Sequence, residues 1–244
     1  MLPEKDSFIA ELSAVFDKNG LSHLLDDEKA DKLHRLTEIL ITENAKYNLT
    51  AITEPSKVIL HHYADCATLA ALLPKGTTLA DIGCGAGFPT LPVAILRPDV
   101  KITGIDSTAK RVAYVNAAAQ QLGCDNVTAI AGRAEELART NLRENFDFAT
   151  ARAVAAMRVL AELSLPFVKL GGSLIAMKGK NAATELSESK RAITTLGGKL
   201  DEVREITLVG TDEELSHPLV FVKKVSKTAP QYPRQFSQIS KKPL

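Results

Sequence analysis

The sequence of 244 residues predicts a doubly wound α/β fold with a mostly parallel, seven-stranded sheet and a helical N-terminal extension. Three observations support this prediction. From residue 77 onward, short apolar runs alternate with helical stretches, as in βαβ units. A glycine-rich loop follows the first of these runs. Before residue 75, apolar residues recur only at helical spacing.

Two helices are expected in the N-terminal part, residues 1–75. The first covers about 28–46 and repeats leucine on one face: Leu33, Leu36, Leu40. The second follows Thr53, a candidate N-cap, with Pro55 in its first turn. A Pro-Lys-Gly sequence at 74–76 ends it.

The central part, residues 76–227, contains the expected sheet. Strands are expected near residues 78–83, 100–105, 127–131, 146–151, 172–178, 203–209 and 218–225, and helices near 90–97, 108–122, 134–140, 156–167 and 181–196. No helix separates the last two strands, so we expect them to pair antiparallel. Residues 228–244 contain three prolines and are expected to form an extended tail.

Composition excludes several classes. Hydrophobic residues make up 45% and charged residues 24% of the chain, an ordinary globular mixture. No apolar run approaches the ~20 residues that cross a bilayer, and the N-terminus lacks the pattern of a signal peptide. The three cysteines show neither disulfide nor metal-ligand spacing. We therefore expect a cytoplasmic protein without a metal site; as a separate expectation, it acts as a monomer.

Charge is unevenly distributed although the net charge is only +1. Residues 1–32 carry eight acidic side chains against four lysines, and no acidic residue follows Glu214. The later cations are Lys223, Lys224, Lys227, Arg234, Lys241 and Lys242. Such a patch suits phosphate groups, but a solvated basic tail is an equally good interpretation.

The glycine-rich loop reads Asp81-Ile82-Gly83-Cys84-Gly85-Ala86-Gly87-Phe88. Its spacing is GxGxG, and Phe88 stands where a GxGxxG dinucleotide fingerprint has its third glycine. Asp81 would repel the phosphates of a dinucleotide but attract the ammonium group of a methionine moiety. The loop therefore favours S-adenosylmethionine over NAD, with Asp81, Gly83, Gly85 and Gly87 as candidate contacts.

Asp106 ends the second predicted strand, nineteen residues after Gly87. This matches the ~20-residue spacing of a carboxylate that binds ribose hydroxyls. A helix cap for residues 108–122 is the structural alternative. The loop and the acid together predict a Rossmann-like, class I methyltransferase.

Two further loops end strands at the same edge of the sheet. Gly132-Arg133-Ala134-Glu135 follows the third strand and would lie beside the adenine. Arg152 ends the fourth strand, where functional residues concentrate, although a surface salt bridge is the alternative. Neither an Asn/Asp-Pro-Pro-aromatic motif nor a Pro-Cys nucleophile is present, which argues against exocyclic amines and cytosine C5 as methyl acceptors.

From about residue 44 to the end, the chain resembles the bacterial 16S rRNA guanine-N7 methyltransferase family known as RsmG or GidB. The matching segments are Tyr47 to Ile52, His62 with Asp65, Asp81 to Pro92, Asp106-Ser107, Lys110-Arg111, Gly132 to Glu135, Ala151 to Ala155, Leu174 to Gly179, Tyr232 to Arg234, and Lys242 to Leu244. The chain departs from the family pattern at Cys66, at Thr90 and between Arg234 and Lys241.

The resemblance implies methyl transfer to a guanine N7 in the conserved decoding-region loop of 16S rRNA, free or within the small ribosomal subunit. It adds Phe88, Ala134, Glu135 and Arg152 as contacts of S-adenosylmethionine. Guanine N7 carries a lone pair and no proton, so no general base is expected. Candidate substrate contacts are Asn48, Arg133, Lys178 and Arg234.

Some alternatives stay open at this point. His62 and Asp65 share a helix face, and we favour a structural role in which the histidine is oriented by its neighbour and docks the N-terminal helices. Asn48 fits a turn cap as well as an RNA contact. A small-molecule methyltransferase would also use the loop and Asp106, but only 5% of residues are aromatic and could wall an acceptor pocket. A nucleotide-dependent oxidoreductase is disfavoured by the glycine spacing.

Overall fold

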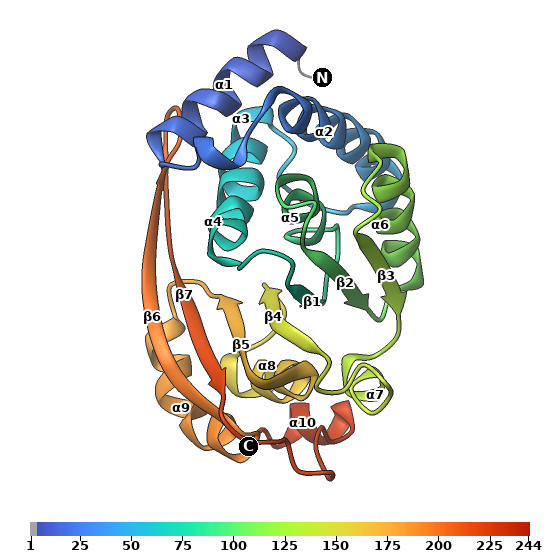
Figure 1. The fold of residues 1–244 in the computed structure, drawn as a ribbon, viewed down its shortest axis with the longest axis vertical. Helices are drawn as coiled ribbons and strands as arrows, with labels where there is room; N and C mark the ends of the chain where they lie inside the picture. The colour runs from blue at the N-terminus through green and yellow to red at the C-terminus, as the bar shows by residue number, and fades with distance from the viewer. Residues whose placement is uncertain (1–3) are drawn as a thin grey trace.

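The computed structural model describes residues 4–244 and contains one seven-stranded sheet with helices on both faces (Figure 1). The strand order is β3-β2-β1-β4-β5-β7-β6, and β7 alone runs opposite to the other six strands. The strands are β1 (Thr78–Ile82), β2 (Lys101–Asp106), β3 (Val127–Ala131), β4 (Phe146–Arg152), β5 (Val168–Met177), β6 (Gly198–Val209) and β7 (Glu214–Lys224). The predicted fold class and the antiparallel pairing of the last two strands are confirmed.

One face of the sheet is covered by N-terminal helices together with α5 and α6, and the other by α7 to α10 (Figure 1). The helices are α1 (Lys5–Lys18), α2 (Asp27–Tyr47), α3 (Pro55–Val58), α4 (Asp65–Leu72), α5 (Thr90–Leu96), α6 (Ala109–Leu122), α7 (Ala134–Leu137), α8 (Met157–Ser164), α9 (Ala182–Thr195) and α10 (Phe236–Lys241). Each face packs its own apolar core against the sheet, as a doubly wound fold requires.

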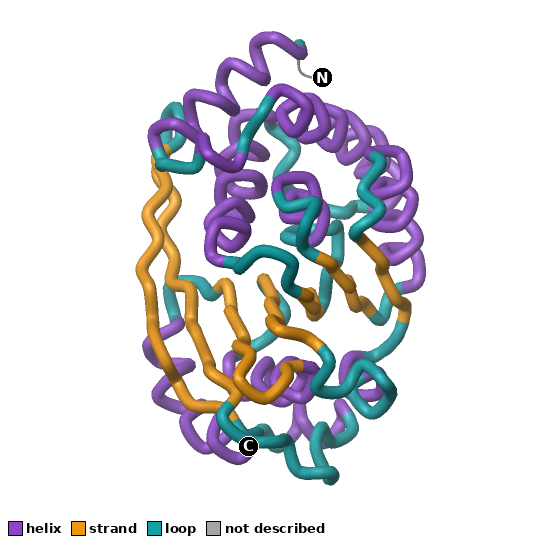
Figure 2. Tube along the Cα trace, in the orientation of Figure 1, coloured by secondary structure: helices purple, strands orange, loops and turns teal. Residues whose placement is uncertain are grey.

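The helical extension also contacts the edge of the sheet that is formed by β6 and β7. Figure 2 shows β6 and β7 side by side along one edge, with their connecting turn beside the N-terminal helices. Asn19, at the end of α1, bonds the backbone of Val209 twice: its amide donates to the carbonyl (2.9 Å) and its oxygen accepts from the N–H (2.9 Å). The extension is therefore joined to the sheet by hydrogen bonds as well as by apolar packing.

The second N-terminal helix contains an irregular turn. It begins at Pro55 with Glu54, not Thr53, as the N-cap residue. Between α3 and α4, residues Ile59–Ala64 form a π-helix, a rare conformation in which backbone carbonyls shift out of the α-helical pattern. This turn lies next to the carboxyl ends of the strands and, as described below, supplies a carbonyl to Arg152.

Several element boundaries differ from the sequence prediction. β5 begins at Val168 because Gly171, with φ of +82°, and Gly172 let the strand pass an irregularity in its pairing with β4. α8 ends at Ser164 because Pro166 cannot donate the next helical hydrogen bond. The tail is not extended throughout, since residues 236–241 form α10.

Within residues 4–244, no helix combines the length and apolarity that crossing a membrane requires.

Candidate active site

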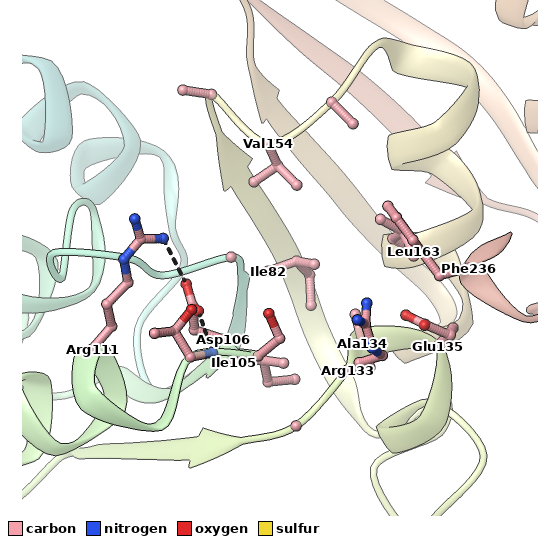
Figure 3. A pocket seen from close by; sticks show the side chains of 16 residues that line it. Ile82, Ile105, Asp106, Arg111, Arg133, Ala134, Glu135, Val154, Leu163 and Phe236 are labelled. Carbon is pink, nitrogen blue, oxygen red and sulfur yellow. Dashed lines mark hydrogen bonds and ion pairs between the residues drawn. The ribbon is translucent and has the colours of Figure 1, made fainter. Parts of the chain in front are cut away.

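A cavity of about 320 Å³ opens where β1, β2, β3 and β4 end (Figure 3). The strand order reverses between β1 and β4, and ligands of open α/β sheets bind at such a switch point. The lining residues follow the four strands and come from two distant helices: Ile82, Gly83, Ile105 to Thr108, Arg111, Gly132 to Glu135, Ala153 to Ala155, Leu163 and Phe236.

Gly83 brings bare backbone to the cavity. Its φ is +75°, and a Cβ atom at this position would lie 2.6 Å from a methyl group of Val154. Both facts exclude larger residues, because the left-handed backbone is strained with a side chain and Val154 already fills the space. Glycine is therefore required here by the approach of the β4 loop to the β1 loop.

Asp106 fixes the glycine loop and still faces the cavity. One carboxylate oxygen accepts the N–H of Gly85 (3.0 Å) and the other accepts the N–H of Thr108 (2.8 Å). Arg111 lies 3.8 Å from the first oxygen. A carboxylate has about four acceptor positions, so two backbone bonds leave room for two hydroxyl donors.

Asp81 lies behind the loop and does not line the cavity. Its side chain is fully buried, and one oxygen accepts a hydrogen bond from Thr90 Oγ1 (2.6 Å). The other oxygen has no hydrogen-bond partner among residues 4–244. Burial raises the pKa of Asp81 to about 6, against the opposing effect of Thr90. A buried carboxylate with one free oxygen is suited to a cationic donor.

The loop after β3 forms the other end of the cavity. Ala134 and Glu135 begin α7, and Glu135 is only 6% exposed although it lines the cavity. Figure 3 shows Leu163 and Phe236 beside Glu135, at the opposite end of the cavity from Arg111. This end of the cavity is apolar except for the carboxylate of Glu135 and the side chain of Arg133.

Arg152 points away from the cavity into a buried polar network. It donates to the carbonyl of His61 in the π-helix (2.8 Å) and to Asp65 (3.0 Å), and its guanidinium lies over the ring of Phe88. On its other oxygen, Asp65 contacts His217 of β7 at 2.6 Å. Arg152 is therefore in a buried ion pair, not the surface salt bridge considered as the alternative.

His62 is oriented by Arg152 and Phe88, not by Asp65 as expected. Its ring stacks on Phe88 with centroids 4.0 Å apart. Burial and the Arg152 guanidinium lower the pKa of His62 to about 3, so the ring is neutral. Nδ1 of His62 lies 3.1 Å from Arg152, which can only donate, and 3.2 Å from the carbonyl of His61, which can only accept, while Nε2 faces Thr50 Oγ1 at 3.4 Å.

The structure thus separates the predicted cofactor residues into two groups. Five residues predicted for the site line the cavity: Gly83, Asp106, Arg133, Ala134 and Glu135. The others support it from behind: Asp81, Gly85, Gly87, Phe88 and Arg152. Gly87 has φ of +83° and is packed against Leu91, and Phe88 is 6% exposed beneath the π-helix.

The remaining substrate candidates are placed differently. Asn48 is exposed at the C-terminus of α2, where its φ of +47° explains the choice of asparagine as a cap. Lys178 Nζ donates to the carbonyl of Ala155 (2.8 Å) and lies 2.6 Å from Glu185. Arg234 pairs with the fully buried Glu162. Both charges are therefore neutralised within the fold, and their contact with RNA stays a prediction.

Eleven lining residues were not among the predicted site residues, and these include Arg111, Val154, Leu163 and Phe236. Arg111 lies one turn into the helix that follows Asp106, so helical spacing places it near the carboxylate. Val154 follows the end of β4 directly. Leu163 and Phe236 belong to α8 and α10, and no local pattern connects them with the glycine loop.

Comparison with known proteins identifies the family. The family model described as rRNA small subunit methyltransferase G matches residues 29–214. The chain belongs to this family. A relative in Clostridium perfringens, named ribosomal RNA small subunit methyltransferase G, is 47% identical over 89% of this chain and 92% of its own length. A relative of the same name in Lactobacillus helveticus is 44% identical over the full length of both chains.

Solved structures agree on the fold. A SAM-dependent O-methyltransferase from Thermotoga maritima superposes with a TM-score of 0.52 at 15% identity, covering 78% of this chain and 72% of its own. TYW2 from M. jannaschii, solved in complex with AdoMet, gives a TM-score of 0.53 at 14% identity, over 66% and 75% of the two chains. At these identities the likeness concerns the fold alone, which is that of class I methyltransferases.

The Asp65 network predicts a pH-dependent stability. Burial disfavours the charged His217 ring, but the Asp65 carboxylate outweighs it and raises the pKa of His217. The folded protein therefore holds this proton more tightly than the unfolded chain. The protonated His217 therefore stabilises the fold fully below about pH 6.5, the ordinary pKa of histidine in an unfolded chain. This contribution to the free energy of unfolding is lost as the pH rises through the raised pKa of the folded protein.

We expect Asp65→Asn to lower the free energy of unfolding by about 3–5 kcal/mol at pH 6.5, because Arg152 loses its buried partner. It should also flatten the decline of stability between pH 6.5 and 8. Urea unfolding at a series of pH values measures both effects, with Asp125→Ala, at an exposed turn, as control. An unchanged slope in Asp65→Asn would exclude His217 as the titrating group.

Proposed function

We propose that the cavity binds S-adenosylmethionine and that the protein methylates N7 of a guanine in the decoding-region loop of 16S rRNA. The observation that carries the proposal is the Asp106 carboxylate, which has two free acceptor positions at the cavity beside the bare backbone of Gly83. Membership of the family supports the choice of ribosomal RNA as substrate.

The residues present fit the parts of this cofactor. Asp106 would accept the two ribose hydroxyls. The buried oxygen of Asp81, which has no partner among residues 4–244, would accept from the methionine ammonium through water, because the carboxyl group does not line the cavity. Ala134 and Glu135 would contact the adenine. None of these roles requires a phosphate site, in keeping with a cofactor that carries no phosphate.

Bound S-adenosylmethionine supplies an electrophilic methyl group. The acceptor N7 presents a lone pair and holds no proton, so the protein needs no general base. Its task is to hold the guanine in line, and orientation of this kind is worth roughly 7–11 kcal/mol. The buried ion pair of Arg152 with Asp65 serves that task indirectly, because it fixes the end of β4 from which residues 153–155 enter the cavity wall.

On the RNA side, the available cations are Arg111 and Arg133. Both lie at the cavity and have exposed side chains. They would contact phosphates near the guanine, a role for which Lys178 and Arg234 are less suited because Glu185 and Glu162 neutralise them. The major-groove edge that carries N7 is inaccessible in regular A-form RNA, so the target must lie in an irregular loop. We propose further that the protein acts as a monomer.

The first prediction concerns the ribose contact. Asp106→Ala should weaken binding of S-adenosylmethionine by roughly tenfold or more, since hydrogen bonds to a charged group contribute about 1.5–3 kcal/mol. Isothermal titration calorimetry measures the affinity, and circular dichroism checks the fold. Asp125→Ala, which removes a carboxylate from an exposed turn, is the matched control. Equal affinities for Asp106→Ala and the control would place the ribose elsewhere.

The second prediction concerns Asp81. With its pKa raised to about 6, the carboxyl must lose a proton to bind the methionine ammonium, which stays charged below pH 7. Affinity for S-adenosylmethionine should therefore rise by up to about tenfold between pH 5 and pH 7 and level off above that. Asp81→Asn should bind more weakly and without this dependence. A flat wild-type profile would remove Asp81 from the site.

The reaction itself is tested by mapping 7-methylguanosine in rRNA by chemical chain cleavage. Cells without the protein should lack one cleavage in the decoding region of 16S rRNA, and the wild-type gene should restore it. The Asp106→Ala gene should not. A cleavage pattern that is identical with and without the protein would overturn the proposed reaction, whatever the cofactor affinity.

A further inference from the structure

The C-terminal segment from Thr228 to Lys241 is fixed to the methyltransferase fold. Arg139 and Arg143, which follow α7, donate to backbone carbonyls along the segment: Thr228, Ala229, Pro230, Gln231, Tyr232 and Pro233. Two arginines thus hold six successive carbonyls. The segment is a structural strap over the face that carries α7 and α8: it begins beside Glu144, just before β4, and its Phe236 reaches the cavity.

A buried ion pair secures the second half of the strap. The guanidinium of Arg234 donates to both oxygens of Glu162, which belongs to α8 and is fully buried (2.6 to 3.2 Å). Its backbone N–H donates to the same carboxylate (2.8 Å). Ile239 of α10 is also fully buried, in the core on this face. Charge and apolar burial together fix the position of α10.

The strap places Phe236 in the wall of the cavity. Phe236 is 40% exposed, unusual for a phenylalanine held in so fixed a segment. The guanidinium of Arg133 lies 5.6 Å from its ring centroid and covers one face. Phe236 also borders a second cavity of about 570 Å³, lined in part by Glu136 and Arg139. The ring therefore stands between the two cavities.

We propose that Phe236 forms the adenine wall of the cofactor site. This inference rests on the proposed function. If Asp106 holds the ribose, the cavity extends in two directions: toward Ile82 and Val154, and toward Glu135, Leu163 and Phe236 (Figure 3). Asp81 lies directly behind the glycine loop, so its negative charge is on the first side and suits the methionine ammonium there. The adenine then occupies the second.

The side chains at the Phe236 end of the cavity are suited to an adenine ring. Phe236 is the only aromatic residue among those of the described chain that line the cavity. A nucleobase gains roughly 1–3 kcal/mol from packing on an aromatic side chain, and the Arg133 guanidinium, 5.6 Å from the ring centroid, helps to hold this ring in place. Phe236 lies beyond residues 29–214, the span that the family model matches, so this chain supplies the wall from outside that span.

The test compares two ligands that share the adenosine part. Phe236→Ala should weaken both S-adenosylhomocysteine and 5′-methylthioadenosine by the same factor, roughly tenfold, in isothermal titration calorimetry. Phe236→Tyr should keep wild-type affinity, and Phe236→Leu should fall between the two. Ser237→Ala, at the next position of the same helix, is the matched control and should bind both ligands normally.

Equal affinities for Phe236→Ala and Ser237→Ala, with an intact fold by circular dichroism, would overturn the inference. So would a loss confined to S-adenosylhomocysteine, because the ring would then contact the amino acid part. Failure of the wild-type protein to bind either ligand is a separate result. It would overturn the proposed cofactor, and with it the basis of this inference.

Discussion

The reversal of strand order between β1 and β4 determines where everything else in this protein lies. Helices that follow the two strands leave the sheet on opposite faces, so the strand ends separate and a cavity opens between them. The loop after β1 must cross this gap close to the loop after β4. The 2.6 Å that would separate a Cβ on Gly83 from Val154 measures how close the two loops are. The glycine pattern is therefore a consequence of topology as well as of ligand binding.

Polar residues on the two sides of the cavity loops have complementary roles. Asp106 holds the glycine loop from the cavity side through its bond to Gly85. From the other side, Arg152 joins β4 to the π-helix and, through Asp65, to His217 of β7. The N-terminal helices thus share a buried ion pair with the catalytic sheet. Breaking it would disturb loop geometry and stability together, because buried charges are costly to leave unpaired.

The sequence predicted those parts of the fold and site that depend on local spacing. Alternating patterns located all seven strands, and the nineteen-residue interval from Gly87 to Asp106 correctly brought the acid to the glycine loop. Spacing could not reveal which charges are neutralised. Lys178 and Arg234 resemble free cations in the sequence, and only tertiary contacts pair them with Glu185 and Glu162. Phe236 was missed for the same reason.

The strap has a consequence for local unfolding. Phe236 reaches the cavity only while Arg139, Arg143 and Glu162 hold the segment that carries it. These contacts lie on α8 and on the loop after α7, not on the strand ends. Loosening of the segment would therefore open one wall of the cavity while the sheet, the glycine loop and Asp106 stay folded.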